Sequence, residues 1–339
     1  MKKINFAIVG CGRVAPRHAD SIIKIKGAEL VAVCDNKRER ADKFGRIYKA
    51  KIYYSLAELL KDSSIDVVNV CTPSGLHAKM TVMAAKAGKH VICEKPMALK
   101  LKDAKKMIDV CMEKKVRLCI VLQNRYNLAM RKFKGVVDSG RLGKLNLASV
   151  CVRWFRPDSY YQDDWHGREK TDGGAVMNQS IHHLDALIWL MGMPKSVFAY
   201  KGTLGHKIEV EDACVAVFKY KSGAMAVFEG STIIYPENIE GSVALFGDKG
   251  SIKVGGTALN KIMLWKVKGQ LDKEKDFLSL QKKNPESVYG FSHKDVIKDM
   301  VEAIKEGRQP NTGQKDGYRC LQLVLAVYES AKKNKEVLI

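Results

Sequence analysis

The first third of the chain alternates short apolar runs with segments in which apolar residues recur at helical spacing. The runs are apolar almost throughout, which is typical of parallel strands that helices cover on both faces. They lie at Ile4–Val9, Glu29–Asp35, Asp66–Thr72, His90–Lys95 and Arg117–Gln123. Between them, Thr81–Ala87 and Ala104–Cys111 have the helical spacing. This rhythm predicts a doubly wound parallel sheet.

After about residue 127 the pattern changes to strands in which apolar and polar residues alternate. Val215–Tyr220 and Met225–Glu229 flank a Lys-Ser-Gly turn, which predicts one hairpin. Ser242–Phe246 and Ser251–Val254 flank Gly-Asp-Lys-Gly, which predicts another. Helices are expected at about residues 177–191, 294–306 and 315–333. An antiparallel sheet therefore follows the parallel one, and 339 residues are enough for two domains.

Net charge is the most unusual feature of the composition. The chain has 58 Lys and Arg against 37 Asp and Glu, a formal net charge of +21. The lysines are scattered and form no long basic block, whereas nucleic-acid binders usually concentrate such charge. We therefore interpret most of the charge as solvated surface lysine and expect no nucleic-acid partner.

Cysteine usage and hydropathy indicate the compartment. None of the nine cysteines belongs to a Cys-x-x-Cys pair, and most lie inside apolar segments, so we expect free thiols in a reducing environment and assign no metal site. No apolar run reaches the roughly 18 residues of a membrane span. These features predict a cytoplasmic protein without a membrane partner.

A glycine motif follows the first strand. Gly10-Cys11-Gly12-Arg13-Val14-Ala15 has the G-x-G-x-x-A pattern of dinucleotide-binding turns. The first glycine permits a tight turn, the second lets backbone approach a pyrophosphate, and the helix N-terminus faces the phosphates. Asp35 ends the second strand, where a carboxylate binds ribose hydroxyls and repels a 2′-phosphate. The motif predicts NAD, although Lys37 and Arg38 weaken the preference over NADP.

Two further strand ends carry candidate chemistry, because ligands of open α/β sheets bind along the carboxyl edge of the strands. The third strand ends in Thr72-Pro73 with His77 shortly after it, and the fourth ends in Glu94-Lys95-Pro96. A lysine beside a proline in an apolar region is costly to bury without a purpose. A tight Lys95–Pro96 bond, open to the cis form, would hold the ammonium over the cofactor.

A third candidate follows the glycine pair Gly173-Gly174. Asn178, His182 and Asp185 have the spacing i, i+4, i+7, which places them on one helical face. An amide and a carboxylate beside an imidazole can orient it for proton transfer near neutral pH. The spacing therefore predicts that His182 is functional, and we interpret His183 as structural.

Together these motifs resemble the glucose-fructose oxidoreductase/inositol dehydrogenase (Gfo/Idh/MocA) family over nearly the whole chain. The resemblance implies an α/β protein with an N-terminal Rossmann domain (1–124) and a C-terminal α/β domain (125–339) with a large open, mainly antiparallel sheet. It also implies subunits that pair into dimers or tetramers, and a last helix able to pack back on the N-terminal domain. Lys95 and His182 take the places of the family's catalytic residues, whereas Asn178 stands where the family usually has aspartate.

One subgroup is especially similar, the nucleotide-sugar 3-dehydrogenases acting on UDP-N-acetyl-2-amino-2-deoxyglucuronate, in routes to surface polysaccharides. Arginines near the motifs suit such an anionic UDP-sugar partner. We expect substrate contacts from Lys95, Asn124, Arg125, Tyr126, Arg156, Tyr160, Asn178 and His182. We expect NAD contacts from Gly10, Cys11, Gly12, Arg13, Val14, Asp35, Thr72, Pro73, His77, Glu94, Lys95, Gln123, Trp165 and Arg168.

The expected reaction is hydride transfer from C3 of the sugar to the nicotinamide. His182 would take the hydroxyl proton while the Lys95 ammonium stabilises the oxygen, and the reverse assignment stays open. One alternative is a family dehydrogenase of another sugar or polyol, such as an inositol or a hexose. Another is a cofactor-binding sensor or nucleic-acid binder, which predicts salt-sensitive binding and no turnover. Reoxidation of bound NADH by 2-oxoglutarate also stays open.

Overall fold

The computed structural model describes residues 3–269, 290 and 292–339. The chain divides into two compact units. The first contains residues 1–122 and 293–318, and the second contains 123–292 and 319–339. This division differs from the predicted domains, 1–124 and 125–339, because residues 293–318 return to the first unit. A return of this kind leaves no mark in the local sequence pattern.

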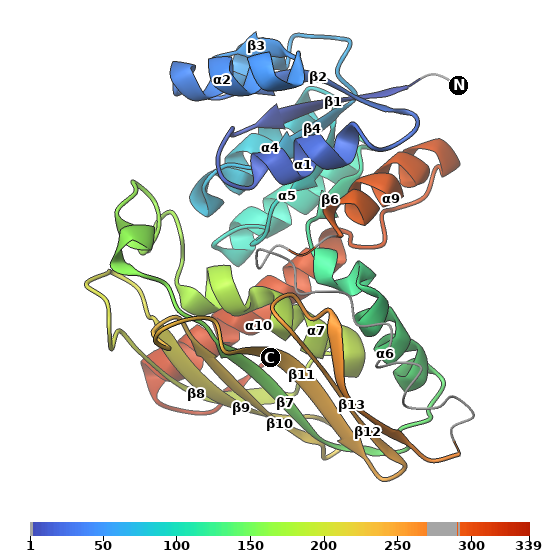
Figure 1. Cartoon of the computed structure of the whole chain (residues 1–339), viewed down its shortest axis with the longest axis vertical. Coiled ribbons are helices and arrows are strands. Elements are labelled where there is room, and N and C mark those ends of the chain that lie inside the picture. Colours follow the sequence, from blue (N-terminus) through green and yellow to red (C-terminus); the bar gives the residue numbers. More distant parts are fainter. Residues whose placement is uncertain (1–2, 270–289, 291) are drawn as a thin grey trace. The chain divides into compact units, whose positions relative to one another are not determined.

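The first unit is built on a six-stranded parallel sheet in the order β3-β2-β1-β4-β5-β6 (Figure 1). Its strands are β1 (Ile4–Val9), β2 (Ala28–Cys34), β3 (Lys51–Tyr53), β4 (Val67–Val70), β5 (His90–Cys93) and β6 (Leu118–Ile120). The order reverses between β1 and β4, and in open α/β sheets ligands bind at such a point, outside the carboxyl ends of the strands.

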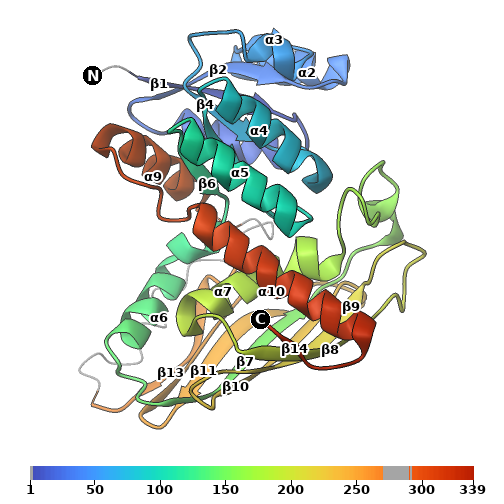
Figure 2. The same cartoon turned by 180° about the vertical axis from the view of Figure 1, so that it is seen from behind.

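Helices cover both faces of this sheet, as the apolar runs predict. They are α1 (Ala15–Ile22), α2 (Arg38–Tyr48), α3 (Leu56–Leu59), α4 (His77–Lys86), α5 (Leu101–Glu113) and α9 (His293–Glu306), with a 3₁₀ turn η1 (Ser74–Leu76). Helices α1 and α9 pack together, and α4 packs on α5 on the opposite face (Figures 1 and 2). All four residues of β4 are buried, which explains why three of them are valines, and the fourth, Asn69, has a buried hydrogen-bond partner in His18.

The second unit is built on an eight-stranded sheet in the order β13-β12-β11-β7-β10-β9-β8-β14. Its strands are β7 (Leu145–Arg153), β8 (Ser196–Gly202), β9 (Ala213–Lys219), β10 (Met225–Ser231), β11 (Glu240–Gly247), β12 (Gly250–Gly255), β13 (Lys261–Val267) and β14 (Val337–Leu338). Both predicted hairpins, β9–β10 and β11–β12, are present. The sheet is mixed because β10 runs parallel to β7, while its other described pairs are antiparallel.

Helices cover one face of this second sheet (Figures 1 and 2). They are α6 (Leu128–Asp138), α7 (Ile181–Met191) and α10 (Gln314–Lys333), with 3₁₀ turns η2 (Gln123–Tyr126) and η3 (Asp158–Tyr161) and the π-helical turn η4 (Val176–Ser180). Burial alternates along β9 and β10, so their inner side chains form core and their outer ones stay open.

Two expectations about the whole chain can be compared with the structure. Among the described residues, none of the helices is long and apolar enough to cross a membrane. All nine cysteines are free thiols, and only Cys11 is more than slightly accessible. The second observation agrees with the absence of Cys-x-x-Cys pairs in the sequence.

Candidate active site

The glycine turn after β1 has the local geometry of a phosphate-binding loop. Gly10 has φ +93°, and a Cβ there would lie 2.6 Å from the Cys71 carbonyl oxygen, so only glycine fits. A Cβ on Gly12 would meet nothing within 4 Å, so its backbone is open to approach. Val14 stands at the N-cap of α1 and has no side-chain acceptor for the first N–H groups. This helix end therefore suits a phosphate group.

Asp35 is fixed directly beside this turn. Its Oδ2 accepts a hydrogen bond from the Cys11 N–H (2.8 Å), and its Oδ1 accepts one from the Lys37 N–H (2.8 Å). The carboxylate thus joins the end of β2 to the glycine turn, as a residue that binds the adenosine ribose should. The residues present fit a dinucleotide.

His77 contacts the backbone at the next two strand ends, those of β4 and β5. Its Nδ1 lies 2.7 Å from the Pro96 carbonyl oxygen, and its Nε2 lies 2.8 Å from that of Thr72. Burial lowers the pKa of His77, so the ring is neutral and donates to one of the two carbonyls at a time. The Lys95–Pro96 bond is cis. The ring of His77 thereby links the Thr72-Pro73 loop to the Lys95-Pro96 loop, and a direct cofactor contact stays a prediction.

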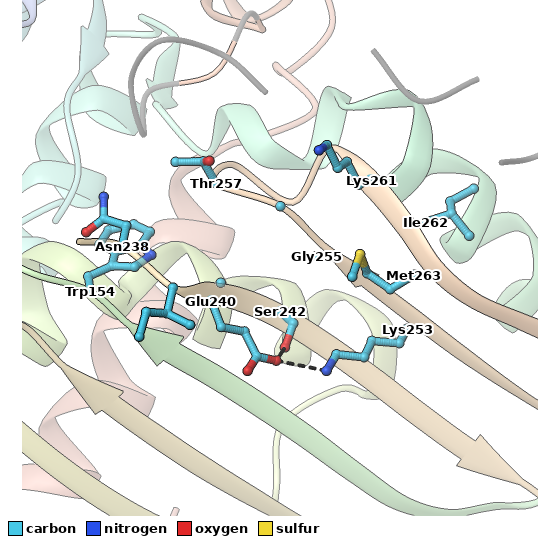
Figure 3. Close-up of a pocket in the computed structure, with 13 residues that line it drawn as sticks. Trp154, Asn238, Glu240, Ser242, Lys253, Gly255, Thr257, Lys261, Ile262 and Met263 are labelled. Carbon is cyan, nitrogen blue, oxygen red and sulfur yellow. Dashed lines mark hydrogen bonds and ion pairs between the residues drawn. The ribbon is translucent and has the colours of Figure 1, made fainter. Parts of the chain in front are cut away.

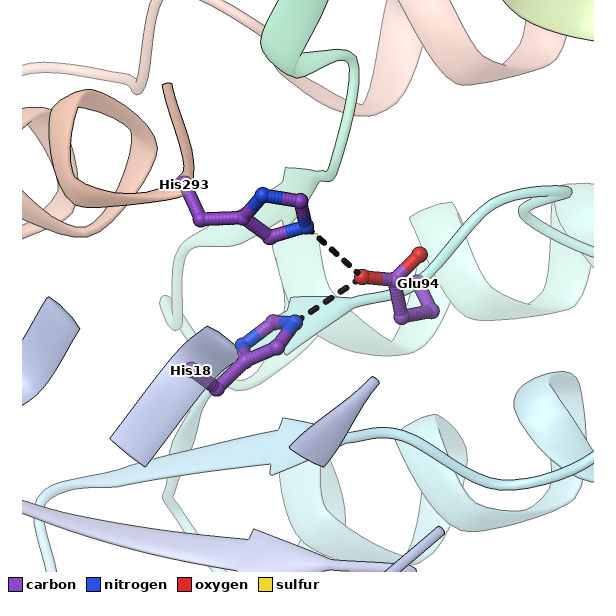
Figure 4. A group of neighbouring side chains, drawn as sticks. All are labelled: His18, Glu94 and His293. Carbon is purple, nitrogen blue, oxygen red and sulfur yellow. Dashed lines mark hydrogen bonds and ion pairs between the residues drawn. The ribbon is translucent and has the colours of Figure 1, made fainter. Parts of the chain in front are cut away.

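Glu94 is the centre of a buried cluster that the sequence did not predict (Figure 4). Its Oε1 lies 2.9 Å from Nε2 of His18 and 3.7 Å from Nε2 of His293. Its Oε2 accepts a hydrogen bond from the Lys95 N–H (3.2 Å). Burial by itself would raise the pKa of Glu94, but the bonds from both histidines outweigh it and hold the pKa well below its usual value. The Glu94 carboxylate therefore holds the backbone of Lys95.

The ligand atoms of this cluster lie within 4.8 Å of one another, a spacing that a metal ion could use. Asn69 Nδ2 donates to Nδ1 of His18 (2.9 Å), so the proton of that ring is on Nε2 and is donated to Glu94. A metal would have to displace this proton. We therefore interpret the group as a hydrogen-bonded cluster. His18 lies on α1 and His293 on α9, and no local motif marks either as a partner of Glu94.

In the second unit, the glycine pair Gly173-Gly174 directly precedes Ala175, the N-cap of the π-helical turn η4. Gly174 has φ +114°, and a Cβ there would lie 2.3 Å from a Glu211 carboxylate oxygen. The Glu211 Oε1 instead accepts hydrogen bonds from the Val176 N–H (3.0 Å) and the Tyr328 hydroxyl (2.6 Å). Glycine at this position therefore lets a buried carboxylate cap the start of the helix.

The predicted helical face is rearranged by the π turn. The Asn178 amide donates to Asp172, and both oxygens of Asp185 accept from Arg125, at 2.9 Å from Nε and 2.7 Å from Nη2. The Nε2 of His182 lies 3.3 Å from the side-chain nitrogen of Gln123. The described contacts place Gln123 beside His182 and Arg125 beside Asp185, and orientation of His182 by Asp185 stays a prediction. Asp172 was not predicted, and its only sequence signal is its place beside the glycine pair.

The predicted substrate arginines also have protein partners. Arg125 is 9% exposed in its ion pair with Asp185. Arg156 donates to the Phe155 carbonyl, to Asn238 Oδ1 (3.0 Å) and to Gln179 Oε1 (2.8 Å). These bonds occupy guanidinium groups that we expected to face substrate.

Some of the other predicted residues contact one another, and for the rest the structure gives their burial. Gln179 donates to the Tyr160 hydroxyl (2.7 Å), which connects Tyr160 to Arg156. Trp165 stacks on His166 with ring centroids 3.6 Å apart, while Arg168 is exposed. Asn124 is buried and Tyr126 is half-buried.

Comparison with known proteins gives the family. Residues 4–122 match the model of an oxidoreductase family with an NAD-binding Rossmann fold (Gfo/Idh/MocA), and residues 130–253 match the C-terminal domain of the same family. The chain belongs to the Gfo/Idh/MocA family. This confirms the predicted fold class and the nicotinamide cofactor NAD, and it makes the protein an NAD-dependent sugar dehydrogenase in the broad sense of that family.

Three relatives show which members of the family the chain is similar to. The chain is 37% identical to the WlbA dehydrogenase of Bordetella pertussis, solved with NADH and UDP-GlcNAcA, with a TM-score of 0.95 over 100% of this chain and 98% of that one. It is 35% identical to the Chromobacterium violaceum WlbA dehydrogenase, with a TM-score of 0.93 over 100% and 96%. It is 28% identical to myo-inositol 2-dehydrogenase of Thermotoga maritima over 98% of both chains. The predicted resemblance to the nucleotide-sugar subgroup is confirmed.

Proposed function

We propose that the protein oxidises the C3 hydroxyl of a UDP-N-acetylglucosaminuronate-type nucleotide sugar with NAD, in the synthesis of a surface-polysaccharide aminouronate. The observation behind this proposal is the full-length similarity, at 37% identity, to a dehydrogenase solved with NADH and UDP-GlcNAcA. The identity is higher than the 28% shared with the inositol dehydrogenase of Thermotoga maritima.

Each unit contributes residues to the proposed chemistry. NAD, when bound, accepts the hydride. The glycine turn and Asp35 would hold the dinucleotide, and the carboxylate of Asp35 favours NAD over NADP by repelling a 2′-phosphate. The Lys95 ammonium would stabilise the oxygen that loses its proton. Glu94 accepts from the Lys95 N–H and His77 contacts the Pro96 carbonyl oxygen, so the backbone is held on either side of that lysine.

His182 is the proposed base. A base at neutral pH must be an unprotonated ring nitrogen. The Gln123 amide donates to Nε2 of His182, which leaves the proton of the neutral ring on Nδ1. Nε2 of His182 can therefore accept the hydroxyl proton once substrate replaces the amide. Asn178 is held by Asp172 and would donate to, or position, the sugar rather than act as a base.

A second candidate function is oxidation of a free inositol or another polyol. It is supported by curated relatives such as the inositol 2-dehydrogenase of Rhizobium meliloti, which is 24% identical over 99% of both chains. A free polyol carries no anionic groups, so this alternative needs no cationic substrate pocket.

NADH formation tests the two candidates directly. The purified protein is mixed with NAD and, in separate reactions, UDP-N-acetylglucosaminuronate, UDP-N-acetylglucosamine, myo-inositol and glucose. We expect turnover of the UDP-uronate and at most slow turnover of UDP-N-acetylglucosamine. Turnover of myo-inositol or glucose with none of either UDP-sugar would overturn the proposal in favour of the alternative.

We also propose that the protein is a homo-oligomer. Leu147, Val215, Val217, Met225 and Val227 lie on the open face of three adjacent strands, each 47% to 55% exposed. A contiguous apolar patch on a sheet usually marks an interface. Light scattering on the wild type and on Val217→Lys tests this: we expect a dimer or tetramer that the charge dissociates, and a monomeric wild type would contradict it.

A further inference from the structure

The second unit contains a hollow whose lining has no part in the proton transfer or the NAD binding proposed above (Figure 3). It encloses about 590 Å³ where β11 and β13 begin and β12 ends. Trp154, Asn238, Thr257 and Lys261 line it, together with exposed apolar side chains of Ile239 and Met263. Its lining therefore combines polar donors with apolar walls.

Two of these side chains present hydrogen-bond donors to the hollow. Trp154 is 4% exposed, and its indole N–H has no acceptor among the residues that the structure describes. Figure 3 shows that nitrogen turned toward the hollow. Asn238 Oδ1 accepts from the Phe155 N–H (2.9 Å) and from Arg156 (3.0 Å), so its amide nitrogen is the part left to donate. A buried donor without an acceptor is unfavourable, and a hydrogen bond to a ligand oxygen would remove this cost.

The charge of the hollow comes from Lys261. Glu240 lies in the lining too, but Lys253 (2.8 Å) and Arg153 (2.9 Å) neutralise its carboxylate. Lys261 is half-buried, and in the described part of the chain it has no acidic partner. Arg125 and Arg156, by contrast, have their guanidinium groups bonded to protein. Lys261 is thus a cation available for an anionic ligand.

The turn that carries Thr257 and Lys261 is held in place. Asn127 Nδ2 donates to the Ala258 carbonyl (2.6 Å), and Asn127 Oδ1 accepts from the Ser292 hydroxyl (2.8 Å). Preorganised groups of this kind lose little conformational entropy when a ligand binds.

The floor of the hollow adjoins the helix that carries the proposed base. A Cβ on Gly241 would lie 2.8 Å from Nε2 of His183, and the His183 ring packs edge-on against Trp154 with centroids 5.6 Å apart. His183 directly follows His182 in the chain. The floor of the hollow therefore contacts the residue next to the proposed base in the chain.

We propose that this hollow binds the nucleoside diphosphate portion of the substrate. Lys261 contacts phosphate oxygens, Trp154 and Asn238 donate hydrogen bonds to ligand oxygens, and Ile239 and Met263 flank the base. The inference rests on the proposed function, since only a nucleotide sugar has such a portion. It adds the location and the residues that recognise the diphosphate.

Calorimetric titration of UDP tests the inference. The full-length protein is first saturated with NADH, so that UDP cannot occupy the dinucleotide site. We expect Lys261→Ala to weaken UDP binding about tenfold and Trp154→Phe to weaken it several-fold, because each removes one hydrogen bond to a ligand oxygen. Lys266→Ala, an exposed lysine on the same strand, is the matched control and should bind as the wild type does. Unchanged NADH binding shows that each variant is folded.

The outcomes separate this inference from the proposed function. Wild-type binding of UDP with no loss in Lys261→Ala and Trp154→Phe overturns the hollow as the site and leaves the nucleotide-sugar function standing. No binding of UDP to the wild type overturns both. In turnover of the UDP-uronate, Lys261→Ala should raise KM about tenfold with kcat nearly unchanged. A fall in kcat alone would contradict a binding role.

Discussion

The two units differ in what makes their candidate sites. In the first unit, much of the candidate site is backbone from short motifs: the turn at Gly10 and Gly12, and the Cys11 and Lys37 N–H groups that donate to Asp35. In the second unit, side chains bind one another across long sequence separations, as Arg125 does with Asp185. A site made from backbone is readable from short motifs, whereas a site made from side-chain partners is not.

The largest effects are expected when the two proposed catalytic side chains, Lys95 and His182, are removed one at a time. We expect Lys95→Ala and His182→Asn each to lower kcat by about 10² to 10⁴, because each removes a charge-stabilising or proton-transfer group. Steady-state NADH formation with the UDP-uronate measures the effect. Lys102→Ala, an exposed lysine on α5, should leave kcat unchanged. Near-wild-type kcat in both site variants would show that these residues are not the catalytic pair.

Arg125 distinguishes a structural partner from a substrate ligand. Arg125→Met leaves Asp185 buried and uncompensated, so we expect it to lower the free energy of unfolding by about 3–5 kcal/mol. Urea unfolding measures this, with Arg131→Met, an exposed arginine on α6, as the control. Unchanged stability together with a raised KM would instead return Arg125 to the substrate-binding role expected from the sequence.

The two glycines of the turn sharpen the comparison within the first unit. Gly12→Ala should leave thermal stability nearly unchanged, because its Cβ meets nothing in the protein, but weaken NADH binding about tenfold by obstructing the pyrophosphate. Gly10→Ala should lower Tm as well, since its Cβ would lie 2.6 Å from the Cys71 carbonyl oxygen. Fluorescence titration of NADH and thermal melts separate the two effects. Equal losses of stability would mean that Gly12 has a packing role.

The smallest expected effect concerns acid. The folded pKa of Glu94 lies well below its usual value of 4.5, so its charge stabilises the fold above pH 4.5 and this contribution is lost as the pH falls below that value. Glu94→Gln should therefore show a flatter dependence of Tm on pH below about 4.5 than the wild type. Identical pH profiles would mean that Glu94 is not ionised in the folded state.

Particular elements show how far local pattern reaches. The run Ile4–Val9 matches β1 residue for residue, and both hairpins of the second sheet form where their turn residues predict them. Strand β3 was not predicted, because three residues at a sheet edge show no periodicity. The π turn at Val176–Ser180 was not predicted either. Its first two N–H groups donate to Glu211 and Tyr328, which lie far along the chain and are invisible to local pattern.

The sequence alone determined the fold class, the NAD turn, the Lys95 motif and the family, since these depend on spacing along a continuous segment. Only the tertiary structure decided that Gln123 contacts His182, that Asp185 pairs with Arg125, and that His18 and His293 meet at Glu94. The structure likewise showed that Arg125 and Arg156 are bonded to protein groups, whereas Lys261 has no acidic partner among the described residues. The physical reason is that partners of a buried polar group are chosen by burial and packing among distant segments, which spacing does not encode.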